Sequence, residues 1–365
     1  RPTMPETARR RLRSQLLTGG AVGSAEEVVD WLVAVQSQDF IGAKWAVGLR
    51  MRAATDAVVE RAFNDGAILR THLLRPTWHF VLPRDIRWLL MLTGPRVQAQ
   101  NMSMCRKLGL DQQTLSRAAA AMGAAVSGGR FATRDELREV VEAAGISTEG
   151  LQRMTYIVMY AELEGMLCSG PRRGKQFTYA LLDERADPLT IDRDEALQQL
   201  TRRYFESRGP ATVHDYARWS GLTLADARRG IDACGSALRR EEIDGTTHWL
   251  GPAADGDDSN APTAFLLSVY DEYLSGYRDR SAMVSHDHGQ RLINRGNALN
   301  YVLVVDTQIV GTWKRTFSKT AVSIEIEVFQ KLTSAQRRAV DAAAQRIGKF
   351  MELRPETVVT VDGRP

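Results

Sequence analysis

Residues 133–181 have the sequence TRDELREVVEAAGISTEGLQRMTYIVMYAELEGMLCSGPRRGKQFTYAL, and they show most clearly the plan on which the chain is built. Thr133 is a predicted N-cap, because Glu136 follows three residues later as in a capping box. Gly145 predicts the end of that helix, and apolar spacing predicts a second helix over about 149–164. Two short strands around a basic Gly/Pro turn then predict a hairpin.

The same order of helices and a hairpin recurs on both sides of this stretch. Helices followed by a hairpin are typical of winged-helix modules, which place a helix in the DNA major groove. Winged helices also serve as protein-interaction modules, so the pattern alone leaves both uses open. The predicted helices of the preceding unit lie near 6–17, 25–36 and 55–66 with strands at 68–72 and 77–81, and the following unit has helices at 212–219 and 224–234 with a hairpin at 238–250.

A linker rich in Gly, Asp, Ser and Pro is predicted over 251–262, and the periodicity changes after it. Alternating and continuous apolar runs predict strands, and a last helix is expected over 334–351. We therefore predict an α+β fold with three tandem winged-helix units and a C-terminal domain resembling a half-open β-barrel. The expected domains are 1–125 with the Gln-x-Gln motif, 126–190, 191–255 and 256–365.

Composition indicates an ordinary globular protein and leaves nucleic-acid binding open. The 365 residues are 44% hydrophobic and 25% charged, with a formal net charge of +4. The cations are mostly Arg, which suits bidentate phosphate contacts, although Arg with abundant Ala and Gly also fits a high-GC genome. The three cysteines are too far apart for a disulfide framework or a metal site. No secretion signal or membrane-spanning run is evident, so we expect a cytoplasmic, nucleoid-associated protein.

Two glutamines, Gln36 and Gln38, stand two residues apart where the apolar pattern of the predicted helix over 25–36 ends. A carboxamide donates and accepts hydrogen bonds without carrying charge, so it can hold a water molecule or a base edge but is a poor proton acceptor. Glutamines at a helix end also often do no more than cap backbone carbonyls, and that alternative stays open at this point.

Basic residues in three places are candidates for DNA contacts. Strand alternation places Arg70 and His72 on one face of the first hairpin, with Arg75 at its turn; a solvated edge strand is the alternative. The turn of the second hairpin is basic. Two further cations, Lys44 and Arg50, lie near Trp45, although a Trp between apolar residues is more often part of the core. The expected DNA-binding residues are Lys44, Arg50, Arg70, His72, Arg75, Arg172, Arg173 and Lys175.

The segment Tyr270–Arg280, YDEYLSGYRDR, is dense in acidic, aromatic and basic residues. We expect Asp271 and Glu272 to form a buried ion-pair network with Arg278 or Arg280 that supports the site. The alternative is that the segment supplies a carboxylate to an active site.

Four motifs in this order give the chain a family resemblance: VQSQ at 35–38, LRTHLLRPTWH at 69–79, the segment 270–280, and VGTWK at 310–314. With them the chain resembles the HTH_42 superfamily of bacterial DNA glycosylases, and within it the actinobacterial AlkZ-type branch associated with azinomycin resistance. The resemblance covers nearly the whole chain. It implies tandem winged helices in a C-shape around DNA, closed by a β-barrel.

The resemblance also implies a catalytic Gln-x-Gln motif at Gln36 and Gln38. The middle position is usually apolar and is Ser37 here, and a sister branch has Asp at the second position. The implied enzyme is a monofunctional glycosylase of bulky N7- or N3-alkylated purines that unhooks interstrand crosslinks, in repair or self-resistance.

We expect no metal or cofactor, no membrane partner, and a monomer that binds double-stranded DNA carrying alkylated purines or crosslinks. The alternatives are a winged-helix transcription regulator without enzymatic activity and a scaffold whose third domain recruits a partner. Release of alkylated bases separates the enzyme from both.

Overall fold

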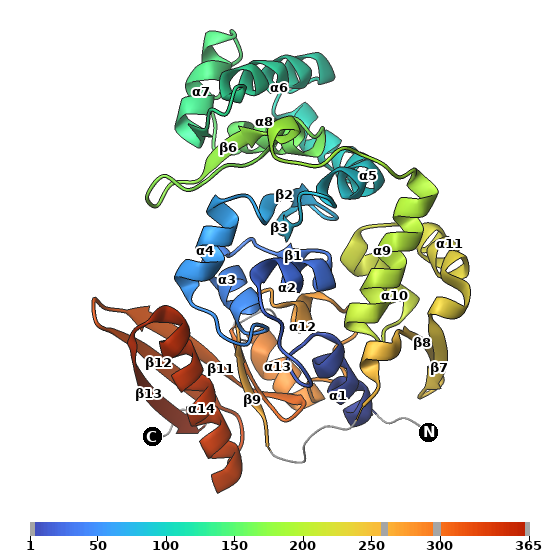
Figure 1. Ribbon diagram of the computed structural model, residues 1–365, viewed down its shortest axis with the longest axis vertical. Helices are drawn as coiled ribbons and strands as arrows, with labels where there is room; N and C mark the ends of the chain where they lie inside the picture. Colours follow the sequence, from blue (N-terminus) through green and yellow to red (C-terminus); the bar gives the residue numbers. More distant parts are fainter. Residues whose placement is uncertain (1–3, 257–261, 295–300, 362–365) are drawn as a thin grey trace.

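The computed structural model describes residues 4–256, 262–294 and 301–361, and it has the α+β fold that we predicted (Figure 1). Helices and small sheets alternate along the chain, and one larger sheet lies near the C-terminus. No helix of the described residues is both long and apolar enough to cross a membrane.

The first unit joins helices to a three-stranded sheet in the order β1-β3-β2. The predicted helix over 25–36 is wrong at its end. Val33 has a left-handed φ of +67°, which ends the helix, and Val35 and Gln36 then pair with β3 as a strand. The elements are α1 (Met4–Ser14), α2 (Ala25–Leu32), β1 (Val35–Gln36), α3 (Phe40–Gly48), α4 (Asp56–Asn64), β2 (Leu69–Leu73), β3 (Thr77–Val81) and α5 (Ile86–Lys107).

The second unit has a capping box formed by Thr133 and Glu136, as predicted. Its helices α6, α7 and α8 lie together at one end of the molecule, above a small sheet (Figure 1). The elements are α6 (Gln112–Val126), β4 (Ala132–Thr133), α7 (Arg134–Ala143), α8 (Arg153–Leu163), β5 (Leu167–Ser169), β6 (Thr178–Leu181) and a short 3₁₀ helix (Leu182–Glu184).

The third unit repeats the order of helices and hairpin. Thr212 caps α10, and α11 has the predicted bounds. Its elements are α9 (Arg193–Arg208), α10 (Val213–Ser220), α11 (Leu224–Cys234), β7 (Arg239–Ile243), β8 (Thr246–Leu250) and short 3₁₀ helices at Gly235–Ala237 and Pro252–Ala254. Residues 257–261 of the predicted linker lie outside the described residues.

The C-terminal sheet has the order β13-β12-β11-β10-β9, with β12 and β13 parallel and the other pairs antiparallel. Within the described residues β9 and β13 lie at opposite edges, so the sheet is open and the predicted barrel is not closed. Helix α14 packs on this sheet (Figure 1). The elements are β9 (Ala264–Leu267), α12 (Glu272–Ser275), α13 (His286–Asn294), β10 (Val302–Val305), β11 (Gln308–Phe317), β12 (Ala321–Val328), α14 (Ser334–Met351) and β13 (Arg354–Val361).

Buried apolar residues form two clusters. The larger draws on the first unit, the third unit and the C-terminal sheet, so these segments pack as one body. The smaller lies within 105–181 and includes most of α6. Helix α6 therefore packs with α7 and α8, although the boundary that we expect after residue 125 assigns it to the first unit.

Candidate functional site

Strand β1 ends at Gln36, and Gln38 lies in the bend that follows it. Gln36 pairs with His79 of β3, and the Ser37 amide donates to the Trp78 carbonyl at 2.7 Å. Gln36 is 8% exposed, Ser37 is fully buried, and Gln38 is exposed. The glutamines therefore do not cap a helix end.

Three hydrogen bonds fix the Gln36 and Gln38 amides. The Gln36 backbone amide donates to Glu272 Oε1 at 2.9 Å, and Arg75 Nη2 donates to the Gln36 side-chain oxygen at 3.0 Å. The Gln38 side-chain oxygen accepts from the Trp78 amide at a longer 3.3 Å. Gln36 is thus held at its backbone and at its carboxamide, while Gln38 is held more loosely.

Two buried ion pairs support β1 and its neighbours. Glu272 Oε2 accepts from Arg208 Nη2 at 2.6 Å and from Trp219 Nε1 at 3.0 Å. The Asp271 carboxylate accepts two hydrogen bonds from Arg50, at 2.9 and 3.0 Å. All four charged side chains are fully buried. The predicted network exists, but its cations are Arg50 and Arg208; the expected partners Arg278 and Arg280 were wrong.

Gln36 lines a cleft of about 640 Å³ whose charged lining residues are all arginines. The pKa of Arg75 is lowered to about 10, mainly by burial; Glu272 raises it, and the nearby cation Arg218 contributes to lowering it. The pKa of Arg280 is likewise lowered by burial and by Arg218. The cleft is therefore strongly electropositive. Its arginines are Arg75, Arg96, Arg218, Arg278 and Arg280, from α5, α10, the β2–β3 turn and the segment after α12.

Backbone conformation brings these arginines together. Gly221 ends α10 with a left-handed φ of +72°, and a Cβ at this position would collide with the Leu74 carbonyl oxygen. The end of α10 therefore packs directly on the β2–β3 turn, where Leu74 itself has a φ of +61°. Tyr270, which also lines the cleft, has a φ of +65°. Non-glycine residues in this region are strained, and such strain clusters at functional sites.

The predicted DNA-binding residues lie in four different surroundings. Arg75 lies in the cleft. Lys44 is 2% exposed and pairs with Asp56 and Glu60, and Arg50 is fully buried against Asp271, so neither is placed to reach a phosphate. Burial follows from the apolar residues on either side of both cations in α3 and the turn after it.

Arg70 and His72 also lie inside, because every position of β2 is buried. The Arg70 guanidinium donates to the Ser37 carbonyl at 3.0 and 3.2 Å and lies 4.3 Å from the Trp78 ring centroid. His72 binds the Glu162 carboxylate of α8. Strand β2 is therefore neither a wing that faces phosphates nor a solvated edge strand. It instead joins the first unit to the second.

The cations of the second hairpin differ in exposure. Arg172 pairs with Glu60 at 3.3 Å and is mostly buried, whereas Arg173 is half exposed and pairs with Glu136 at 2.7 Å. Lys175 is exposed and has no ion-pair partner among the described residues.

The sequence analysis missed Arg96 and Arg218 and assigned Arg278 and Arg280 to the wrong role. The two missed residues stand on helices with no local motif around them, so only the tertiary packing reveals them.

The chemistry of this cleft is that of dipoles and cations. Glu272 is saturated by three donor groups, and burial holds the pKa of His79 well below its usual value, with Arg75 adding to this effect. Neutral amide oxygens can orient a water molecule, and the arginines can bind phosphates. In the described residues no group of three or more His, Cys, Asp or Glu side chains is arranged to hold a metal ion.

Comparisons with known proteins agree on one relationship. A family model described as DNA glycosylase AlkZ-like matches residues 29–350. The interstrand DNA cross-link repair glycosylase of Streptomyces sahachiroi is 27% identical over 318 residues, which cover 83% of this chain and 85% of that protein. The solved structure of the Streptomyces sahachiroi DNA glycosylase AlkZ matches with a TM-score of 0.82 at 22% identity, over 98% of this chain and 99% of that one. At this identity the structural match establishes a shared fold.

Proposed function

Because the chain belongs to the AlkZ-like family of DNA glycosylases, we propose that its arginine-lined cleft hydrolyses the N-glycosidic bond of bulky purines alkylated at N7 or N3. The family resemblance read from the sequence is confirmed, and the protein is a DNA glycosylase. The matched family is a family of enzymes, which argues against the transcription-regulator alternative. Since a relative is named as a cross-link repair glycosylase, we extend the proposal to unhooking of interstrand crosslinks.

Alkylation at N7 or N3 places a positive charge on the purine, so the base leaves as a neutral molecule. The enzyme then has no need to protonate the leaving group. It must place a water molecule near C1′ and stabilise a sugar with oxocarbenium character. The side-chain dipoles of Gln36 and Gln38 serve both purposes, because each amide oxygen accepts one hydrogen bond from the protein and keeps a second lone pair for the water or the sugar.

The observation that carries this proposal is the position of Gln36. Its carboxamide lines a cleft with five arginines and no carboxylate, while its backbone is held by Glu272. The arginines supply contacts to the phosphates on both sides of a lesion, and phosphate contacts fix the register of a protein on duplex DNA. We assign DNA contact to the five cleft arginines, to Arg173 and to Lys175.

The breadth of the cleft fits a bulky adduct. Its walls come from the first unit, α5, α10 and the segment 270–280, so it is a trough between elements rather than a narrow hole. Ordinary base flipping requires the modified base to enter a snug pocket, which a large adduct or a crosslink opposes. We propose that the three helix-and-hairpin units act as winged helices along the DNA, that the chain works as a monomer, and that it acts at the cytoplasmic nucleoid.

The test is base release by Gln36→Ala and Gln38→Ala. Substrates are a duplex with one 7-methylguanine and a duplex with one nitrogen-mustard crosslink; readouts are free base, heat-labile abasic sites and separated strands. Loss of one preorganised dipole should slow base release about 10²-fold under single-turnover conditions. DNA binding should change little.

Gln100→Ala is the matched control, because Gln100 lines the same cleft but lies on α5, away from the motif. It should retain most of the rate. If both motif variants release 7-methylguanine as fast as the unmodified protein at equal DNA binding, the proposed catalytic role is wrong. If they fail only on the crosslink, the crosslink proposal stands and the monoadduct proposal does not.

A further inference from the structure

The residue that follows Gln38 uses its side chain in an unexpected way. Asp39 is the N-cap of α3, but its carboxylate makes no cap hydrogen bond with that helix. It accepts instead from the hydroxyl group of Tyr301, which lies far along the chain at the start of β10 in the C-terminal sheet. A cap hydrogen bond normally stabilises a helix. An N-cap aspartate that lacks this bond is therefore expected to have another partner, which here is Tyr301.

Gly42 makes room for this arrangement. A Cβ at residue 42 would lie 2.5 Å from Asp39 Oδ2 and 3.0 Å from the Ser268 Cβ, although the backbone here is helical and does not need glycine. The missing side chain therefore leaves space for the Asp39 carboxylate to lie against the first turn of α3, where it meets the Tyr301 hydroxyl group.

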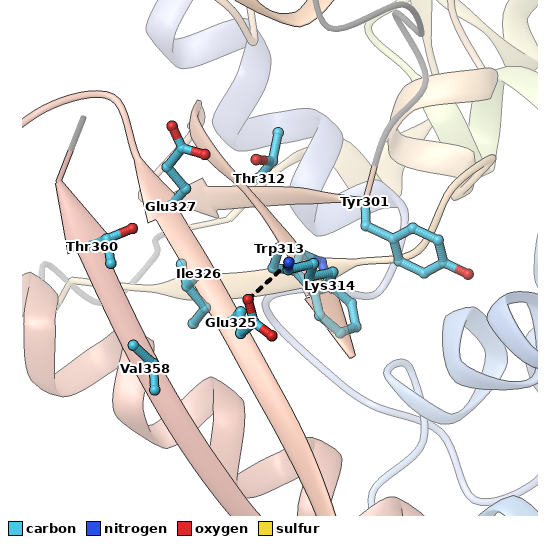
Figure 2. Close-up of a pocket in the computed structure, with 9 residues that line it drawn as sticks. All are labelled: Tyr301, Thr312, Trp313, Lys314, Glu325, Ile326, Glu327, Val358 and Thr360. Carbon is cyan, nitrogen blue, oxygen red and sulfur yellow. Dashed lines mark ion pairs between the residues drawn. The ribbon is translucent and has the colours of Figure 1, made fainter. Parts of the chain in front are cut away.

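Tyr301 is itself fixed by its neighbours in the sheet. The Trp313 amide donates to the Tyr301 carbonyl at 3.0 Å, and the two rings meet edge to face at 5.2 Å. Arg315 Nη2 donates to the Tyr301 hydroxyl oxygen at 3.3 Å. In Figure 2 the phenol points away from the other residues labelled on the sheet. Burial raises the pKa of Tyr301, so the hydroxyl group stays protonated and donates a hydrogen bond to Asp39.

The same sheet also holds the helix that begins after Asp39. Trp45 Nε1 of α3 donates to the Leu266 carbonyl of β9 at 2.7 Å, and its ring packs 5.2 Å from Phe350 of α14. A Cβ at Gly48 would collide with the Phe350 ring, so α3 lies directly against α14. The C-terminal sheet and α14 thus contact α3 at Trp45 and Gly48, and Tyr301 contacts Asp39 at the start of the helix.

The two glutamines are consequently held from different parts of the chain. Gln36 is fixed by Glu272 and Arg75, whereas Gln38 has one long hydrogen bond of its own to Trp78. We propose that Tyr301 is a positioning residue for Gln38, acting through Asp39, so that the C-terminal sheet sets the geometry of the second catalytic amide. This inference rests on the proposed catalytic role of Gln38.

The test is a double-mutant cycle between Tyr301→Phe and Gln38→Ala. Loss of one hydrogen bond should lower the single-turnover release of 7-methylguanine about 3- to 10-fold, with an unchanged Kd for the same duplex. In the Gln38→Ala background, Tyr301→Phe should cause no further loss, because there is no amide left to position. Asp39→Asn, which keeps an oxygen acceptor for the hydroxyl, should be milder than Asp39→Ala.

Tyr160→Phe is the matched control, since the Tyr160 hydroxyl also makes two hydrogen bonds, with Gln112 and Ser116, in the other core. It should leave the rate unchanged. Thermal unfolding of every variant shows whether a lower rate comes from a loss of folded protein. If Tyr301→Phe is not folded, the rate of Asp39→Asn is compared with that of the unmodified protein instead. No fall in rate with Tyr301→Phe, or an equal fall in both backgrounds, would overturn the inference while leaving the proposed function intact. A Gln38→Ala variant as fast as the unmodified protein would contradict the catalytic role of Gln38 and the inference with it.

Discussion

We predict that Arg218→Gln flattens the salt dependence of DNA binding by the equivalent of one phosphate contact. Arg218 is exposed on α10, lines the cleft beside Gln36, and has no hydrogen bond or ion pair with the described residues. It also lies close enough to Arg75 to lower the pKa of that guanidinium, although burial is the larger cause. Arg75 and Arg218 are neighbouring cations in a cleft whose lining includes no carboxylate, as expected where an anion binds.

The magnitude follows from counterion release. Each phosphate neutralised on B-DNA contributes about −0.9 to the slope of log K against log salt concentration. Between about 50 and about 200 mM salt, the unmodified protein should therefore lose about 3.5-fold more affinity than Arg218→Gln. The assay is the Kd for an undamaged duplex at four or more salt concentrations, measured by fluorescence anisotropy.

Arg229→Gln is the control, because Arg229 is also an exposed helical arginine but lies outside the cleft and pairs with Asp194 at 3.1 Å. Its slope should equal that of the unmodified protein. An unchanged slope for Arg218→Gln, or equal changes for both variants, would refute the assignment of the cleft as the phosphate-binding surface.

Three further predictions test the remaining assignments. Lys44→Met should leave the salt slope unchanged but lower the free energy of unfolding by about 1–3 kcal/mol, because the Asp56 carboxylate loses its ion pair and Glu60 keeps only Arg172; a flatter slope would contradict this. Lys175→Ala should flatten the slope by about 0.9, and an equal slope would remove that residue from the DNA-binding surface. His79 is buried with its pKa lowered by burial and by Arg75, so the unfolded chain binds its proton more readily; stability should therefore fall as pH drops below about 6.5, less so in His79→Gln, as urea melts at several pH values would show.

Local signals were sufficient for most of the elements. The capping box at Thr133 and Glu136, the helix Leu224–Cys234 and the helix Ser334–Met351 all have the predicted bounds or partners. Each depends on residues within a few positions of one another, so the sequence alone carries the information. The parallel pairing of β12 with β13 joins strands separated by a whole helix, and nothing in either strand indicates that the sheet stays open.

The residues that line the cleft were only partly predicted from the sequence. The pair Gln36 and Gln38 was expected at a helix end, whereas Gln36 lies on strand β1 and Gln38 in the bend after it. The left-handed φ of Val33 and the pairing with β3 decide that difference, and both are imposed by tertiary packing on a residue that seldom adopts such a φ. The apolar neighbours Ala43 and Trp45 indicate that Lys44 is buried, but the positive charge of Lys44 alone had suggested a DNA contact.

The electrostatics of the cleft impose a condition on catalysis. A sugar that gains positive charge is opposed by five nearby guanidinium groups, and Glu272 cannot offset them because Arg208 already neutralises it. Phosphates of the bound strand are the remaining source of negative charge on the reacting side. Bound DNA would therefore complete the electrostatic environment of the site. The two neutral amides would stabilise a cationic transition state only when the arginines bind phosphates.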